Sequence, residues 1–358
     1  MKTNIIQKDI DSIIQELGEL LNNLSGKTIL ITGGNGFIAS YIVDVITTFN
    51  NQLNNQSKLP CKLIIINKNP INQNSRLSHL ITDPNVEFLS KDISKPFEIS
   101  QKINIIIHAA SRANPTSFLE NPLDTIDTNI NGIRTLLDFA KNNPIENFLF
   151  FSSGEVYGNP PEEFIPIPET FNGNVDTLSA RACYAESKRF GETLCSVFFR
   201  KYNVPVKILR VFHTYGPGLR DDGKAITDFF NDAKNNKKIT LKDKGDSKIA
   251  FCYISDTITG IFKILFHGEK GEAYNIGNDD KVISIKELAE NIATLCGNIP
   301  VLITDNGSFR DNYKIVRRMP EISKLKSLGF EPKISMKEGL ERMYLSDKEQ
   351  ITQTTQSL

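Results

Sequence analysis

Short apolar runs alternate with longer segments of helical periodicity along the first 212 residues of the chain. The runs are rich in β-branched residues, which is typical of strands buried on both faces of a parallel sheet. The expected strands are 27–32, 62–67, 86–89, 103–108, 148–153 and 206–212. Apolar spacing predicts helices from residue 37 onward, over 122–141 and over 184–202. This alternation predicts an α/β fold with a doubly wound parallel sheet and right-handed crossovers.

The segments on either side of this region follow other patterns. Residues 1–26 place a set of isoleucines and leucines on one helical face, which fits packing on the same domain or, alternatively, a subunit contact. That set is Ile10, Ile13, Ile14, Leu17, Leu20, Leu21 and Leu24. From 216 to 343 short strands and helices mix, which predicts a smaller C-terminal α/β substrate-binding lobe. Parts of 272–296 are candidates to return to the first domain, which is expected to span 27–215. Residues 344–358 form a polar tail that we expect to fray.

A glycine-rich turn joins the first expected strand to the first expected helix. The spacing is Gly33-x-x-Gly36-x-x-Ala39, with alanine where a helix must pack closely on a strand. A helix N-terminus beside a turn without Cβ atoms binds anions, because its free N–H groups point outward. The turn therefore predicts a phosphate cradle, although a tight turn that happens to hold glycines would read the same way.

Composition excludes several classes of partner. Lys+Arg and Asp+Glu are 42 each among 358 residues, so no basic field is present to attract nucleic acid or anionic lipid. No apolar run is long enough to cross a membrane, and the N-terminus lacks the apolar core of a signal peptide. Five scattered cysteines and four histidines favour a reduced, cytoplasmic protein without a metal site.

Tyr184 and Lys188 lie four residues apart on an expected helix and therefore share one face. A nearby ammonium group favours the phenolate, so we expect the pKa of Tyr184 to fall from its usual value of about 10. Tyr184 would then serve as a general base that takes a hydroxyl proton during hydride transfer. The alternative is an ordinary Tyr/Lys pair on a solvated helix face.

Polar groups also follow the expected strand 148–153. Ser153 and Glu155 emerge together there, and functional groups of open parallel sheets collect at the carboxyl ends of strands. The alternative is a polar turn with Glu155 in solvent.

With the glycine turn, the strand-end serine and Tyr-x-x-x-Lys in this order, the chain resembles the extended short-chain dehydrogenases/reductases, the NAD-dependent epimerase/dehydratase family. Three further stretches carry the resemblance: His108-Ala109-Ala110-Ser111, Arg210-Val211-Phe212-His213-Thr214-Tyr215-Gly216-Pro217 and Tyr274-Asn275-Ile276-Gly277-Asn278. Within that family the active-site helix, Arg181-Ala182-Cys183-Tyr184 onward, is most similar to UDP-glucuronate decarboxylases. The resemblance implies a Rossmann domain, bound NAD, a nucleotide-sugar substrate with UDP favoured, transient oxidation of sugar C4, a role in polysaccharide biosynthesis and a homodimer.

The triplet Ser153-Gly154-Glu155 bears on the reaction. It falls where the decarboxylases carry Thr-Ser-Glu, where sugar 4,6-dehydratases carry Thr-Asp-Glu, and where 4-epimerases usually lack the glutamate. A 4-ketone acidifies C5–H, and Glu155 could take that proton. Loss of the 6-hydroxyl as water also calls for an acid, and Gly154 has none. Decarboxylation needs no such acid, because the 4-ketone is itself the electron sink, so decarboxylase is favoured over dehydratase, epimerase and a non-catalytic dinucleotide-binding protein.

The resemblance also implies individual site residues. The implied catalytic residues are Ser153, Glu155, Tyr184 and Lys188. The implied cofactor contacts are Gly33, Gly36, Phe37, Ile38, Asn67, Asp92, Ile93, Ala109, Ala110, Ser111, Tyr184, Lys188 and Phe212. The implied substrate contacts are Arg112, Glu155, His213, Arg220, Lys248 and Arg318.

Three positions depart from the family pattern. Asn67 stands where an acidic residue normally binds the adenosine ribose, so NAD is expected and NADP stays open. His213 replaces a usual asparagine, and Ile249 stands where an arginine commonly holds the substrate diphosphate. Lys248, Arg220 or the pair Arg317-Arg318 could compensate for that arginine.

Overall fold

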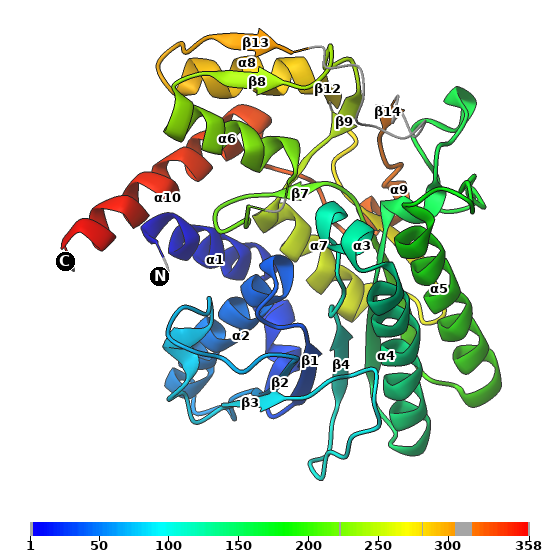
Figure 1. The fold of residues 1–358 in the computed structure, drawn as a ribbon. Coiled ribbons are helices and arrows are strands. Elements are labelled where there is room, and N and C mark those ends of the chain that lie inside the picture. The colour runs from blue at the N-terminus through cyan, green and yellow to red at the C-terminus, as the bar shows by residue number, and fades with distance from the viewer. Residues whose placement is uncertain (1–2, 222, 281, 305–316, 357–358) are drawn as a thin grey trace.

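A parallel sheet of seven strands forms the centre of the protein (Figure 1). The computed structural model describes residues 3–221, 223–280, 282–304 and 317–356. The strand order is β11-β6-β5-β4-β1-β2-β3. The bounds are β1 Thr28–Thr32, β2 Lys62–Asn67, β3 Val86–Ser90, β4 Ile105–His108, β5 Asn147–Ser153, β6 Val206–Val211 and β11 Ala273–Ile276. The predicted doubly wound sheet is confirmed, and the six expected strands lie close to their expected bounds.

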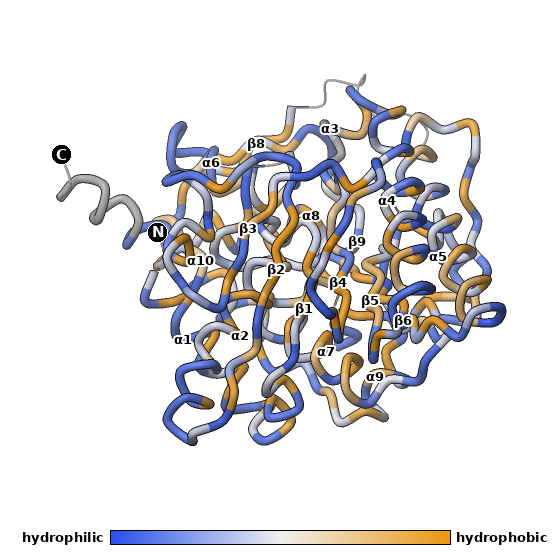
Figure 2. The backbone as a smooth tube through the Cα atoms, turned by 90° about the horizontal axis from the view of Figure 1, so that it is seen from below, coloured by the Kyte–Doolittle hydropathy of each residue, from blue (hydrophilic) through white to orange (hydrophobic). Residues whose placement is uncertain are grey.

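Helices cover both faces of this sheet because side chains alternate along each strand. Ile29 and Ile31 of β1 pack into the core with the helices α2 (Phe37–Asn55) and α7 (Ile254–His267). Leu30, between them, packs into the opposite core with α4 (Pro122–Asn142) and α5 (Ala182–Tyr202). Figure 2 shows the apolar stretches that run along the central strands between these two layers.

The N-terminal helix packs on its own domain, as the first of the two interpretations predicts. It comprises α1 (Asn4–Leu17) and a 3₁₀ segment η1 (Gly18–Leu24), and it contacts α2 and α7. Its apolar face is buried, with Ile10 fully inaccessible to solvent. At the other end of the chain the expected frayed tail is instead helical, because α10 extends over Met336–Gln356.

Buried polar contacts join these two terminal helices. The Asp9 carboxylate accepts hydrogen bonds from Tyr253 Oη at 2.7 Å and from Arg342 Nη1 at 2.5 Å. The Thr3 and Ser346 hydroxyls lie 2.8 Å apart in the same interface. A carboxylate as deeply buried as that of Asp9 needs such partners, so the contacts account for the order of the C-terminal helix.

The second lobe contains three small sheets and several helices. The strand pairs and triplets are β7 (Thr214–Tyr215) with β10 (Cys252–Tyr253), β8 (Ile239–Leu241) with β13 (Val301–Ile303), and β9 (Lys248–Ala250) between β12 (Val282–Ser284) and β14 (Arg317–Arg318). The helices here are α6 (Ala225–Asn236) and α8 (Ile285–Leu295). Helix α9 (Ser323–Lys326) packs instead on β11 and α7. Short helical segments elsewhere are α3 (Pro115–Glu120), η2 (Ser78–Leu80), η3 (Gly154–Tyr157) and η4 (Glu162–Phe164). A capping box between Ser284 and Glu287 starts α8.

The boundary between the lobes is expected near residue 216, with parts of 272–296 as candidates to return to the first domain. Strand β11 pairs with β6 at the edge of the main sheet, and α7 packs under that sheet. Helix α8 packs on α6 and stays in the second lobe. Of the segment 272–296, therefore, the strand returns to the first domain and the helix does not.

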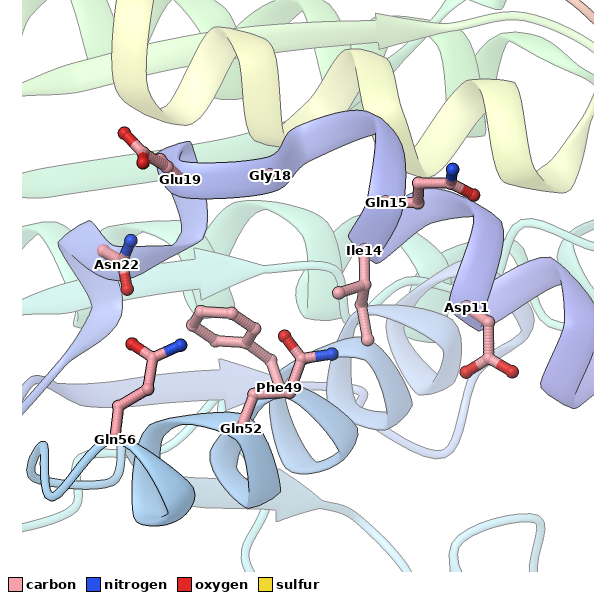
Figure 3. Close-up of a pocket in the computed structure, with 9 residues that line it drawn as sticks. All are labelled: Asp11, Ile14, Gln15, Gly18, Glu19, Asn22, Phe49, Gln52 and Gln56. Atoms are coloured by element: carbon pink, nitrogen blue, oxygen red, sulfur yellow. The ribbon is translucent and has the colours of Figure 1, made fainter.

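A pocket of about 460 Å³ lies between the N-terminal helix and α2 (Figure 3). Its lining residues are Asp11, Ile14, Gln15, Gly18, Glu19, Asn22, Phe49, Gln52 and Gln56. None of them belongs to the predicted site, and the carboxyl ends of the sheet strands do not contribute to the pocket. Within the described part of the chain, no helix is both long and apolar enough to span a membrane.

Candidate active site

The glycine turn between β1 and α2 leaves no room for side chains. Gly33 has a φ of +70°, and a Cβ atom there would lie 2.7 Å from Ala110 Cα. A Cβ on Gly36 would lie 3.0 Å from the Gly33 carbonyl oxygen. Gly36 caps α2 without any side-chain hydrogen bond, so the first N–H groups of the helix remain available to an anion. This geometry fits the phosphates of a dinucleotide.

Polar groups at the end of β2 extend this cradle. The backbone N–H of Asn35 donates to the side-chain oxygen Oδ1 of Asn67 at 3.1 Å. Asn67 Nδ2 and Asn35 Oδ1 are both buried, and neither has a hydrogen-bond partner among the described residues. Asp92 Oδ1, beyond β3, accepts bonds from the Ser94 amide and hydroxyl. Unpaired buried polar atoms are costly, and a ribose at this point would satisfy them. The residues therefore fit NAD.

The other predicted cofactor residues lie around the turn or beneath it. Phe37 and Ile38 open α2, and Ala109 and Ala110 follow β4 directly beside Gly33. Ile93 is buried against α4, where it would contact a Cβ on Gly132. Phe212 packs in a small buried cluster with Val156, Tyr157 and Ile167. The cofactor contacts themselves stay predictions.

Ser153, Tyr184 and Lys188 meet at the carboxyl ends of the sheet strands. Ser153 ends β5, and its hydroxyl accepts from the Glu155 amide at 3.2 Å. Tyr184 lies in the first turn of α5 and stacks on Phe118, with ring centroids 5.2 Å apart. The two-residue pattern on α5 is thus part of a site, not of a solvated helix face, since Tyr184 and Lys188 are both buried.

The expected lowering of the pKa of Tyr184 is wrong for this structure. Burial raises the pKa of Tyr184 to about 12, although hydrogen bonds with Ser153 and Ser111 oppose that rise. Lys188 Nζ lies 5.9 Å from the Tyr184 ring centroid and donates to the Phe151 carbonyl oxygen at 2.8 Å. Burial lowers the pKa of Lys188 to about 7, so its own charge is only partly present near neutral pH.

This burial predicts a pH-dependent effect of Lys188→Met. Protonated Lys188 destabilises the fold fully below pH 7, and the penalty declines between pH 7 and 10.5. We therefore expect Lys188→Met to have a higher free energy of unfolding than the parent at pH 6. This difference should be smaller by about 2–3 kcal/mol at pH 9. Denaturant unfolding at both pH values measures the difference.

Lys201→Met is the matched control, because Lys201 is exposed on the last turn of the same helix. Its difference from the parent should stay constant with pH. A constant difference for Lys188→Met as well would show that Lys188 is not desolvated in the folded state.

Glu155 is held between two arginines. Arg318 Nη1 bonds its carboxylate, and Arg181 Nη2 lies 3.8 Å from Glu155 Oε1. Burial alone would raise the pKa of Glu155, but the charges of Arg318 and Arg181 outweigh burial and hold the pKa below its usual range. Glu155 is therefore an ionised carboxylate in the site and not a solvated turn residue.

Gly154 lies beside this carboxylate and is itself enclosed. A Cβ atom on Gly154 would come 3.1 Å from the Phe212 ring. A side chain at this position would therefore require the Phe212 ring to shift by a few tenths of an ångström.

The predicted substrate residues do not all lie together. Arg318 and His213 lie with Glu155. Burial and, to a smaller extent, the charge of Arg318 lower the pKa of His213 to about 3, so its ring is neutral. Arg112 is at the rim and bonds Asp124 at 3.0 Å. Arg220 Nη2 donates to the Asn35 carbonyl oxygen at 3.4 Å, which places it over the glycine turn and not near the catalytic residues.

Strand pairing decides among the cations that could replace the arginine missing at Ile249. Ile249 and Arg318 are registered partners on β9 and β14, and paired residues project to the same face. Lys248, one residue earlier, is exposed and projects to the opposite face. The Arg317 side chain lies outside the described residues. Arg318 is therefore the cation that shares the face of Ile249.

Two hydrogen-bonded sets that support the site escaped the sequence interpretation. Ser111 Oγ bonds Asn129 Oδ1 at 2.7 Å, and Asn129 Nδ2 donates to Ser187 Oγ at 2.8 Å, which ties α4 to the catalytic helix. A second set surrounds Arg210, which bonds Glu192 at 2.7 Å and Tyr157 at 2.9 Å. A polar residue on the inner face of a helix was the available signal for Asn129 and Glu192.

A dinucleotide cradle and a Ser/Tyr/Lys set on one doubly wound sheet define the class of short-chain dehydrogenase/reductase proteins. Residues 29–277 match the NAD dependent epimerase/dehydratase family, and the chain belongs to that family. It is 33% identical over 322 residues to UDP-glucuronic acid decarboxylase 5 of Arabidopsis thaliana, covering 89% of each chain.

Solved structures agree with this fold. A dTDP-glucose 4,6-dehydratase from Streptomyces venezuelae, determined with NAD bound, superposes with a TM-score of 0.75 at 21% identity, over 91% of this chain and 98% of that one. A UDP-N-acetylglucosamine 4-epimerase from Methanobrevibacter ruminantium superposes with a TM-score of 0.76 at 23% identity, over 92% of this chain and 99% of that one.

Proposed function

We propose that the protein is an NAD-dependent nucleotide-sugar decarboxylase that acts on UDP-glucuronate. The observation that carries this proposal is the ionised Glu155 between Arg318 and Arg181, next to a Gly154 that offers no acid. The named activity of relatives that are 33% identical over most of both chains supports the same substrate.

Bound NAD would accept hydride from sugar C4 and return it later. Tyr184 would take the proton of the C4 hydroxyl, and Ser153, which hydrogen-bonds Tyr184, would orient that hydroxyl. Because the buried phenol is neutral at pH 7, it must first lose its proton to solvent, and the hydroxyls of Ser153 and Ser111 stabilise the phenolate that results. Lys188 adds positive charge on the same helix face.

The 4-ketone then accepts the electron pair of the C5–C6 bond as CO₂ leaves, and the resulting enolate takes a proton from solvent at C5. Return of the hydride to C4, with the proton held on Tyr184, would then restore the C4 hydroxyl. No protonated carboxyl group is needed for this step, whereas expulsion of the 6-hydroxyl as water requires an acid. Glu155 is ionised and Gly154 has no side chain, so the triplet suits decarboxylation. Glu155 also holds Arg318 and Arg181 in place, where their charges favour an anionic substrate.

The test is incubation of the full chain with NAD⁺ and UDP-glucuronate labelled with ¹³C at C6. We expect labelled CO₂ and a UDP-pentose that, in D₂O, carries one deuterium at C5. A 4-keto-6-deoxy product from a nucleotide hexose would show a dehydratase instead, and a C4-inverted sugar of unchanged mass would show an epimerase. If none of the nucleotide sugars reacts, the protein is a non-catalytic dinucleotide binder.

We also propose a homodimer through α4 and α5. Leu123, Phe190 and Val197 on these helices are 75%, 47% and 39% exposed, whereas Phe198 faces the sheet core. Light scattering of the purified chain should give twice the mass of the monomer; the mass of a monomer would contradict the proposal. The cytoplasmic location and the role in polysaccharide biosynthesis stay predictions.

A further inference from the structure

The ribose end of the cofactor cradle lacks the carboxylate that usually excludes NADP. In Rossmann folds an Asp or Glu at the end of the second strand binds the adenosine 2′-hydroxyl, and its charge repels a 2′-phosphate. Asn67 occupies that end of β2. We infer that this pocket accepts a phosphate on the adenosine 2′-oxygen, so that the protein binds NADP(H) as well as NAD(H). The inference rests on the dinucleotide binding proposed above.

The orientation of Asn67 supports a phosphate acceptor. A backbone N–H can only donate, so the bond from the Asn35 amide fixes the oxygen of Asn67 toward the glycine turn. The NH₂ group of Asn67 therefore points away from the glycine turn. This Nδ2 atom is buried and has no partner among the residues described. An N–H donor suits a phosphate oxygen, which only accepts, at least as well as a hydroxyl.

Charged side chains around the two asparagines add to this preference. The Arg220 guanidinium contacts the Asn35 carbonyl oxygen, and the rest of its side chain is exposed, so its remaining N–H groups can reach a ligand. Lys68, next to Asn67, lies 3.4 Å from Asp92 and offsets the charge of that carboxylate. Arg220 thus brings a guanidinium to the cradle, and such a group forms charge-assisted bonds with a phosphate more strongly than with a hydroxyl.

A second arginine holds the loop that carries Arg220. The Arg76 guanidinium lies over the Tyr41 ring, 4.3 Å from its centroid. It also fills the space beside Gly218, where a Cβ atom would come 2.2 Å from Nη1. The loop that carries Arg220 is therefore packed against α2, whose N-terminus forms the cradle.

The test compares two ligands that differ only in the phosphate, ADP-ribose and 2′-phospho-ADP-ribose. Both lack the nicotinamide, so calorimetry of the full chain measures binding and not turnover. We expect the two dissociation constants to agree within about tenfold. A larger preference for ADP-ribose would overturn the inference but leave dinucleotide binding intact. If neither ligand binds, both proposals fail.

Three variants locate the effect. Arg220→Gln should weaken 2′-phospho-ADP-ribose by about tenfold and ADP-ribose by less than about threefold, since it removes a charge-assisted bond to the phosphate. Asn67→Asp should weaken only the phosphorylated ligand, again by about tenfold or more. Arg200→Gln removes a charge at the C-terminal end of α5, the sheet edge opposite the site, and should change neither ligand. An equal loss of both ligands with Arg220→Gln would assign Arg220 to the pyrophosphate and contradict a 2′-phosphate site.

Discussion

Tyr184→Phe should lower kcat by about 10²- to 10⁴-fold, because it removes only the hydroxyl that moves the substrate proton. The phenyl ring keeps its stacking on Phe118 and its buried position on α5. Only the hydrogen bonds of the Tyr184 hydroxyl with Ser153 and Ser111 are lost. Steady-state kinetics with the labelled sugar nucleotide measures the loss, and nucleotide affinity measured separately should change little.

Tyr202→Phe provides the matched control for this prediction. Tyr202 ends the same helix, and its ring packs on Phe198, with centroids 5.3 Å apart. Its turnover should equal that of the parent. If Tyr184→Phe also kept turnover within about threefold, another group would carry the proton, and the assignment of Tyr184 as the base would be wrong.

Local chemistry explains how much the sequence alone could predict. The turn at Gly33 and Gly36 depends on backbone torsions and on its place between one strand and one helix, which are properties of a short segment. The alternation of strands and helices can be predicted because each type of element has its own spacing of apolar residues, which is visible within a short segment. Ser153 is placed by the rule that polar groups collect at the carboxyl ends of parallel strands, and Tyr184 and Lys188 are placed together because residues four apart share one helix face.

Long-range contacts explain what the sequence could not supply. The pKa of Tyr184 is governed by burial, which the i, i+4 spacing with Lys188 does not reveal. The partner of Glu155 is Arg318, brought in by strand β14 from 163 positions away. The order of the C-terminal helix depends on Asp9, at the far end of the chain, because only the folded lobe brings Arg342 to it.

The largest effect on stability is expected from Arg210→Met. Arg210 Nη2 bonds Glu192 at 2.7 Å and its Nη1 bonds Tyr157 Oη at 2.9 Å, and both ionic side chains are less than one-seventh exposed, at 14% and 13%. The variant leaves the Glu192 carboxylate buried with Ser152 as its remaining partner. We expect a loss of about 3–5 kcal/mol in unfolding free energy. Glu192 is one turn beyond Lys188 on α5, so the catalytic helix should loosen as well.

Two further variants separate burial of an unpaired charge from loss of packing. Arg210→Met combined with Glu192→Met removes both charges and should be more stable than Arg210→Met alone, because no unpaired carboxylate remains. Arg134→Met breaks an exposed pair with Asp138, at 2.7 Å, and should cost less than about 1 kcal/mol. Thermal and denaturant unfolding of the three variants measures these differences. If the double variant were less stable than Arg210→Met, the cost would lie in packing, and Glu192 would not be the residue that makes Arg210 necessary.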